Sequence, residues 1–195
     1  YGIPLAHIGY EGRAYKAQSY HLNAGSRVGP LDYFFFGSQN SESGFRDHSD
    51  ARTYNIGGNA GLSMGKAGKL LLDIAAHHNN AASPGQIMPD IPTNQYDNDI
   101  EKFSPTPSAR RTVESNYVRT SYLLPLPNDS LAAFRFFGSE RDAGLTNPDD
   151  VIDLERFEQS KGAEMEFQLP MGWMLGGTFM EDRVDSRDEA TAAAT

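Results

Sequence analysis

Residues 51–78 alternate between apolar and polar side chains, which predicts two β-strands joined by a tight turn. From Tyr54 to Met64 the even positions are apolar or small, and the odd positions are polar or glycine. A period of two is typical of a strand with one apolar face. Gly65–Gly68 breaks the pattern as a turn would, and alternation resumes over Leu70–Ala76 with Leu71 as the exception. Each arm has about a dozen residues, closer to the about 9–11 of a membrane-spanning strand than to the 5–6 of an average one.

The same pattern recurs along the chain and predicts an all-β protein. We expect nine strands, at residues 5–12, 15–28, 31–41, 51–64, 69–78, 111–124, 130–139, 152–169 and 173–184.

The expected connections differ in length between the two ends of the sheet. Those after the second, fourth, sixth and eighth strands are short, and those after the third, fifth and seventh are long and polar, at 43–50, 81–109 and 140–151. Outer-membrane barrels have short turns on one side and longer loops on the other. A soluble up-and-down barrel has no reason to sort its loops in this way. We therefore predict an antiparallel up-and-down transmembrane β-barrel segment, about nine strands of a larger barrel.

Composition excludes several classes of protein. The longest apolar runs, such as residues 33–36, are far shorter than the about 20 residues of a membrane-spanning helix. The net charge of −9 argues against a nucleic-acid partner. The absence of cysteine excludes disulfides, thiolate zinc sites and thiol nucleophiles. Both ends look cut, since the chain starts at Tyr1 and finishes without a closing strand pattern, so we expect a segment of a longer protein.

We find no catalytic motif and expect no enzyme activity. His77 and His78 are adjacent, so in a strand they point to opposite faces and cannot chelate one metal. Glu164 and Glu166 share a face, where solvated lumen charges explain them better than a catalytic pair. The loop at 81–109 contains three aspartates and could hold Ca²⁺, but without EF-hand spacing an acidic surface loop is the preferred interpretation.

Several stretches together resemble the first barrel strands of TonB-dependent outer-membrane receptors, in the cobalamin- and siderophore-receptor branch. The resemblance covers nearly the whole chain, and its order and spacing carry it. Its motifs are Asp32–Gly37 (DYFFFG), Ser43–Asp50 (SGFRDHSD), the strand–GKAGK–strand hairpin, Ser83–Gly85 (SPG) and Gly172–Phe179 (GWMLGGTF).

The resemblance implies a bacterial outer-membrane importer of a scarce ligand such as a ferric siderophore or cobalamin. It also implies a plug domain, absent here, that contacts TonB, and a closed barrel of about 22 strands. On this interpretation residues 1–187 form part of the barrel and 188–195 begin the next loop. The calcium-binding acidic loop of the cobalamin receptor has only a short equivalent here, with Asp47 and Asp50.

The expected ligand contacts lie on the long loops, because binding residues concentrate on loops held by a rigid scaffold. The candidates are Tyr96, Phe103, Arg110, Arg111, Phe45 and Arg46. Two other classes stay open from sequence: a passive porin or adhesin-type barrel, and a soluble β-sandwich or carbohydrate-binding module. The sandwich would show the same alternation, with its apolar faces packed on each other.

Overall fold

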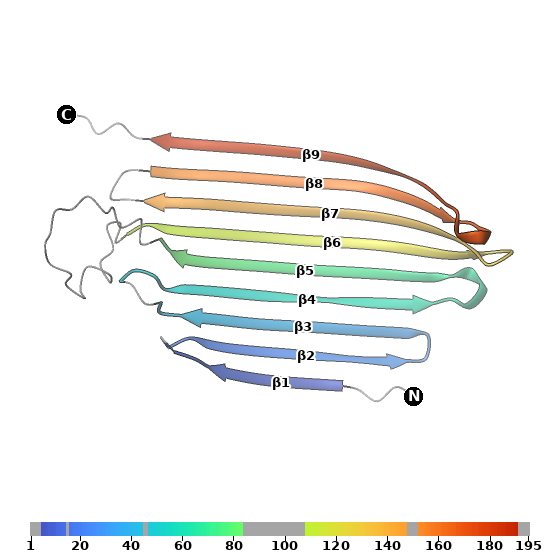
Figure 1. Ribbon diagram of the computed structural model, residues 1–195, viewed down its shortest axis with the longest axis horizontal. Helices are drawn as coiled ribbons and strands as arrows, with labels where there is room; N and C mark the ends of the chain where they lie inside the picture. The colour runs from blue at the N-terminus through green and yellow to red at the C-terminus, as the bar shows by residue number, and fades with distance from the viewer. Residues whose placement is uncertain (1–4, 15, 45–46, 84–107, 148–151, 191–195) are drawn as a thin grey trace, which may run out of the picture.

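The computed structural model is one antiparallel sheet of nine strands in sequence order (Figure 1). It describes residues 5–14, 16–44, 47–83, 108–147 and 152–190. The all-β, up-and-down prediction is confirmed. The strands are β1 (Leu5–Gly12), β2 (Gln18–Val28), β3 (Leu31–Glu42), β4 (Ala51–Ser63), β5 (Lys69–Ala82), β6 (Arg110–Leu126), β7 (Ser130–Asn147), β8 (Ile152–Gln168) and β9 (Met174–Ala190).

Four tight turns close one end of the sheet, at the right of Figure 1. They follow β2, β4, β6 and β8, and two of them contain the short 3₁₀ segments η1 (Gly65–Ala67) and η2 (Pro170–Gly172). Positive φ angles occur in all four, at Gly29, Gly65, Asn128 and Gly172 among others. Glycine and asparagine tolerate this conformation best, so the turn residues explain why the strands reverse where they do. This turn end agrees with the sequence prediction.

The opposite end differs from the prediction in one connection. The expected polar loop at 140–151 is wrong, because residues 140–147 continue β7 and pair with β8 as far as Asn147. The two apolar side chains of this stretch, Ala143 and Leu145, lie on the opposite face from Phe134 and Phe136, so residues 140–147 do not continue the alternation of the strand. Strands β5, β6 and β9 also run further toward this end than predicted. Of the three long connections that the sequence predicted, those after β3 and β5 are still long, at residues 43–50 and 83–109.

The register separates the sheet into an apolar face and a polar face. Directly paired residues in an antiparallel ladder lie on the same face. Ile56 pairs with Ala76, Ala60 with Leu72, and Leu62 with Leu70. The intervening residues Asn55, Asn59 and Asp73 therefore lie on the other face. The predicted facing of the 51–78 hairpin agrees with this register.

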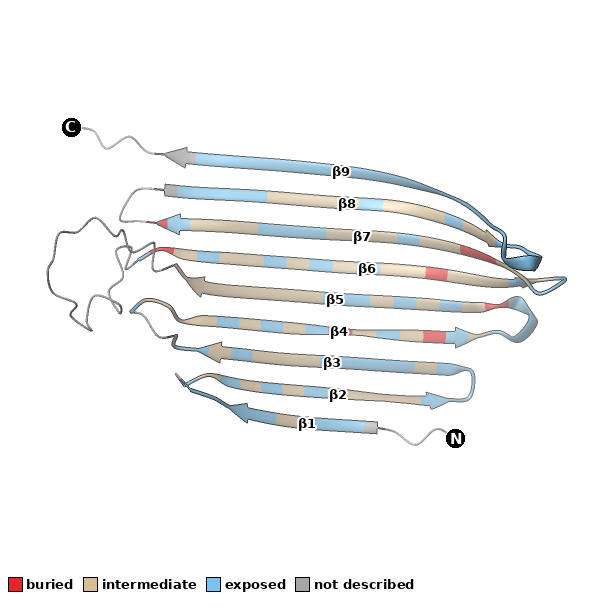
Figure 2. Ribbon diagram, in the orientation of Figure 1, coloured by how far each residue is buried: buried red, intermediate tan, exposed pale blue. Residues whose placement is uncertain are grey.

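Exposed and less exposed residues alternate along the central strands (Figure 2). The more exposed ones lie on the apolar face, which reverses the arrangement of a soluble sheet. Ile56 is 65% exposed and Ile74 53%. Among the described residues the buried apolar side chains are three alanines, Ala109, Ala132 and Ala133, and no large side chain is fully buried. The sheet is a single layer, so its apolar face has no second layer of described residues against it.

The exposed area of the chain is far above that of a compact monomer. It is 14053 Å² for a mass of 21.4 kDa, against roughly 9,100 Å² from the size scaling of folded monomers. Strands β1 and β9 form the two edges, and within the described residues each pairs with one neighbour only. No helix in the described residues is long and apolar enough to span a membrane.

Candidate functional site

A ladder of ion pairs crosses the turn-side half of the polar face. Lys69 Nζ on β5 lies 3.0 Å from Asp32 Oδ1 on β3, and the pair spans β4 above Gly61. A Cβ at Gly61 would lie 2.7 Å from both Asp32 Oδ1 and Lys69 Cε, so the missing side chain leaves room for the contact. Arg119 Nε donates to Asp73 Oδ2 at 3.1 Å. These opposite charges neutralise one another across the sheet.

Arg135 on β7 completes this ladder by bridging two carboxylates. Its Nη1 lies 2.8 Å from Glu164 Oε1 and 2.8 Å from Glu166 Oε2, both on β8. The sequence prediction placed the two glutamates on one face but did not identify Arg135 as their partner. Only the β7–β8 register brings them together, and the period of two does not determine register. The two carboxylates are thus held by one guanidinium, as in a structural charge cluster.

The loop-side half of the polar face over β2–β5 carries mainly uncharged hydrogen-bonding groups. Asn55 donates to Ser38 Oγ at 3.1 Å and shares a 2.7 Å hydrogen bond with Nδ1 of His77. Thr53 Oγ1 donates to Asn79 Oδ1 at 3.2 Å. His78 lies on the other face, where its Nδ1 is 2.9 Å from Glu114 Oε1. The two adjacent histidines therefore do point to opposite faces, as predicted.

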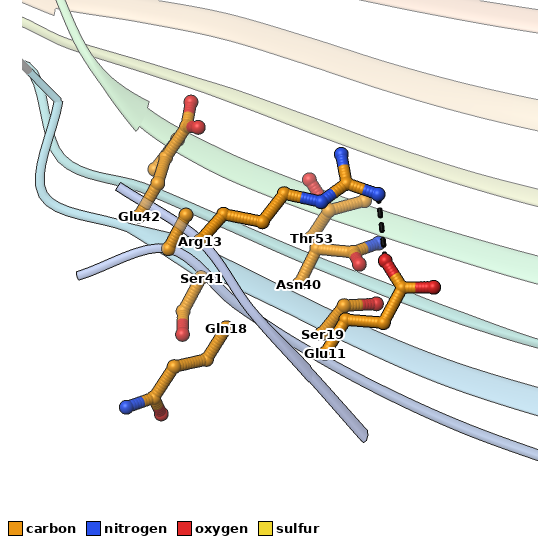
Figure 3. A pocket seen from close by; sticks show the side chains of 10 residues that line it. Glu11, Arg13, Gln18, Ser19, Asn40, Ser41, Glu42 and Thr53 are labelled. Atoms are coloured by element: carbon orange, nitrogen blue, oxygen red, sulfur yellow. Dashed lines mark hydrogen bonds and ion pairs between the residues drawn. The ribbon is translucent and has the colours of Figure 1, made fainter. Parts of the chain in front are cut away.

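A pocket of about 290 Å³ lies at the loop end of β1–β4 (Figure 3). Its lining is mostly polar, and Arg13 Nη2 spans one side to reach Glu11 Oε2 at 2.6 Å. Ser19, Asn40 and Thr53 contribute to it from the polar face. It is close to the lower limit of the usual size of small-ligand pockets, about 300 Å³. The sequence prediction had not identified this pocket, because its residues come from four strands.

A second polar cluster ties together the bases of two loops. Arg110 Nη2 lies 2.8 Å from Asp50 Oδ2, and Arg110 Nε donates to Asn80 Oδ1 at 2.9 Å. Nε2 of His48 is 2.5 Å from the carbonyl oxygen of Ala109. The hydrogen bond from Arg110 holds the pKa of the Asp50 carboxyl below its ordinary value. The cluster therefore joins the 43–50 connection to the start of β6.

The structure separates the two predicted arginines. Arg110 pairs with Ala82 in the register and so lies on the apolar-face side, with its charge engaged by Asp50. Arg111 is exposed and lies on the polar-face side. The other candidates, Tyr96, Phe103, Phe45 and Arg46, lie outside the described residues, so their ligand contacts stay predictions.

Among the described residues no three histidine, cysteine, aspartate or glutamate side chains gather as a metal site would require. The aspartates of the 81–109 loop fall outside the described residues, so the calcium possibility stays untested. No family model and no curated protein matches this chain. The functional argument therefore depends on the two faces of the sheet.

Proposed function

We propose that this chain forms nine strands of the barrel of a TonB-dependent receptor in a bacterial outer membrane. The observation that carries the proposal is the exposed apolar face on strands of 11–18 residues from β2 onward. On β4 the face runs from Tyr54 to Leu62, nine residues, and the eight rises between them span about 26 Å at 3.3 Å per residue. The apolar band of an outer-membrane barrel is about 25 Å tall.

Aromatic side chains lie at both limits of this band, as they do at membrane–water interfaces. Tyr10, Tyr20 and Tyr54 share one level toward the loop end, and the Tyr10 and Tyr20 rings are 5.0 Å apart between centroids. Tyr122 and Phe134 lie at the turn end with centroids 6.5 Å apart. Tyrosine at the edges of an aliphatic band supports contact with lipid headgroups.

The band also crosses the strands obliquely, which supports a tilted barrel wall. The paired row through Ala60, Leu72, Thr120 and Phe136 reaches Ala163 on β8. On β4 the apolar stretch begins at Tyr54, six residues closer to the loop end than Ala60, the residue of β4 in this row. On β8 the apolar stretch begins at Ala163, which is in the row itself. Strands of such barrels tilt by about 35–45° from the membrane normal.

The open edges support closure by further strands. A bare strand edge cannot be satisfied in lipid, so spanning sheets must be closed barrels. The polar face would then line the lumen. The motif resemblance favours an active importer, with a ligand such as a ferric siderophore or cobalamin held by lumen residues and outer loops. Energy would arrive through a plug domain from TonB, and the barrel itself would do no covalent chemistry.

The test is the topology of the two ends in whole cells expressing the full-length protein. Single cysteines at Asp47 and at Ala67 report on the loop end and the turn end, and both positions are exposed. A membrane-impermeant thiol reagent should label the first and spare the second, since long loops face outward. Labelling of Ala67→Cys alone would invert the topology. Recovery of the protein from cells in buffer without detergent would exclude a membrane barrel.

A further inference from the structure

Two phenylalanines stand out on the polar face because their rings lie over glycines. Phe34 pairs with Gly25 on β2, and Phe36 pairs with Gly57 on β4. A Cβ at Gly25 would be 3.1 Å from Cδ2 of Phe34, and one at Gly57 would be 2.8 Å from Cζ of Phe36. Each ring therefore lies against bare backbone. We name the pair the Phe34–Phe36 platform.

The platform is open to whatever occupies the polar side of the sheet. The ring centroids are 6.4 Å apart with an interplanar angle of 32°. Phe34 is 41% exposed and Phe36 is 38% exposed. The rest of this face carries hydroxyls, amides and ion pairs. Exposing two aromatic rings to a water-filled lumen is unfavourable, and covering them with an apolar surface of a ligand is favourable.

The residues directly opposite the platform across the ladder are uncharged. Phe34 lies between Gly25 on β2 and Asn59 on β4. Phe36 lies between Asn23 on β2 and Gly57 on β4. Asn23 and Asn59 therefore place amide groups beside the two rings.

A path of hydroxyl, amide and imidazole side chains connects the platform with the pocket at the loop end. One row toward that end lie His21, Ser38, Asn55 and His77. One row further lie Ser19, Asn40 and Thr53, which line the pocket together with the charged side chains of Glu11, Arg13 and Glu42. Successive rows on one face are about 7 Å apart. The nearest charges on the turn side, Asp32 and Asp73, are paired with Lys69 and Arg119. The path thus favours a neutral ligand over an anionic one.

We propose that the Phe34–Phe36 platform binds the pyranose rings of a neutral oligosaccharide. The apolar C–H face of such a ring covers an aromatic side chain, while its hydroxyls both donate and accept hydrogen bonds at the rim. This inference rests on the proposed function, in which the polar face lines an aqueous lumen.

The experiment measures oligosaccharide affinity for the full-length protein in detergent, by calorimetry and by saturation-transfer NMR. The probes are maltohexaose and cellohexaose, which present α- and β-linked glucose. Phe36→Ala should weaken binding of whichever probe binds by about 2- to 12-fold, the range of single aromatic contacts. Phe36→Trp should retain binding, because it keeps the stacking surface.

The matched control is Phe137→Ala on the same face. The Phe137 ring also lies over a glycine, with its Cζ 2.5 Å from a Cβ at Gly162, but its cross-strand neighbour is Arg119. This variant should bind both probes as the unsubstituted protein does. The circular-dichroism strand signal of every variant should be unchanged, which separates lost stacking from lost folding.

The proposal is overturned if neither probe binds, if Phe36→Ala binds unchanged, or if Phe137→Ala weakens binding equally. These outcomes are distinguishable from a failure of the proposed membrane function. If cysteine labelling supports an outer-membrane barrel but neither saccharide binds, the saccharide proposal is rejected and the barrel proposal stands. Recovery of the protein in detergent-free buffer rejects the membrane-barrel proposal, regardless of whether the saccharides bind.

Discussion

Ile74 and Asp73 are neighbours on β5 whose side chains meet different surroundings. Ile74 lies in the middle of the apolar face, between Gly58 and Val118 in the register. Asp73 lies on the polar face against Arg119. Because successive side chains of a strand point to opposite faces, Ile74 faces the proposed lipid and Asp73 faces the proposed lumen.

Substitution at these two positions should have unequal effects on stability. Ile74→Arg should lower the free energy of unfolding by about 2–4 kcal/mol, because it places a charge near the bilayer midplane. Asp73→Asn should cost about 1 kcal/mol or less, since the partly exposed pair contributes little and the amide oxygen still accepts from Arg119. Urea titration of the full-length protein in lipid vesicles measures both values. Equal losses would contradict the assignment of the faces.

The cluster at the loop bases makes a prediction about pH. Because the pKa of Asp50 is lowered in the folded protein by the hydrogen bond from Arg110, the contact stabilises the fold above the ordinary pKa of a carboxyl group. That contribution is lost as the pH falls through the lowered pKa. Arg110→Gln should raise the pKa of Asp50 toward its ordinary value, measured by NMR of labelled aspartate carboxyls.

Asn80→Ala is the control for this titration, because Asn80 contacts Arg110 but not Asp50. Its effect on the pKa of Asp50 should be small. An unchanged pKa in Arg110→Gln would show that Arg110 is not the cause.

At the scale of elements, the apolar–polar pattern predicted all nine strands but not their full lengths. Alternation is visible only where the two faces of a strand meet different surroundings. The stretch Glu140–Asn147 of β7 and the polar end of β9 do not continue the alternation of their strands, so the sequence predicted loop there. Pairing partners such as Arg135 with Glu164 depend on register, which the turns and the whole ladder determine together. The loop-base and platform contacts were unpredictable for the same reason.

The turn between β4 and β5 shows how closely one element packs on the next. Tyr122 on β6 donates to the carbonyl oxygen of Ala67 at 2.6 Å. Gly68 has a φ of 98°, and a Cβ there would contact the carbonyl oxygen of Leu123. Gly65 has a φ of 62° with no heavy atom within 4 Å of a Cβ. The two glycines of one turn are therefore under different constraints.

Gly68→Ala should lower the free energy of unfolding by about 1–3 kcal/mol, because the conformation is strained for any side chain and the space is occupied. Gly65→Asn should have a small effect, since asparagine tolerates the left-handed conformation in open space. Thermal and urea unfolding of both variants provide the comparison. A larger loss from Gly65→Asn would show that this turn is packed differently.

At the scale of the whole molecule, the two faces of the sheet define an inside and an outside, and the described residues form no hydrophobic core. In water the exposed apolar face and the two unpaired edges would promote association. In a closed barrel the same features become a lipid-facing wall and a continuous hydrogen-bonded ladder. The central claim is thus that the surroundings change from lipid to water between successive residues of one strand.

Site-directed spin labelling along β5 tests this claim most directly. The chain has no cysteine, so single cysteines at positions 70–77 of the full-length protein, with any others removed, can each carry a nitroxide in lipid vesicles. Labels at Leu70, Leu72, Ile74 and Ala76 should collide mainly with oxygen, which dissolves in lipid. Labels at Leu71, Asp73, Ala75 and His77 should collide mainly with a water-soluble nickel chelate. Nickel accessibility at all eight positions, or alternation in the opposite phase, would contradict the account.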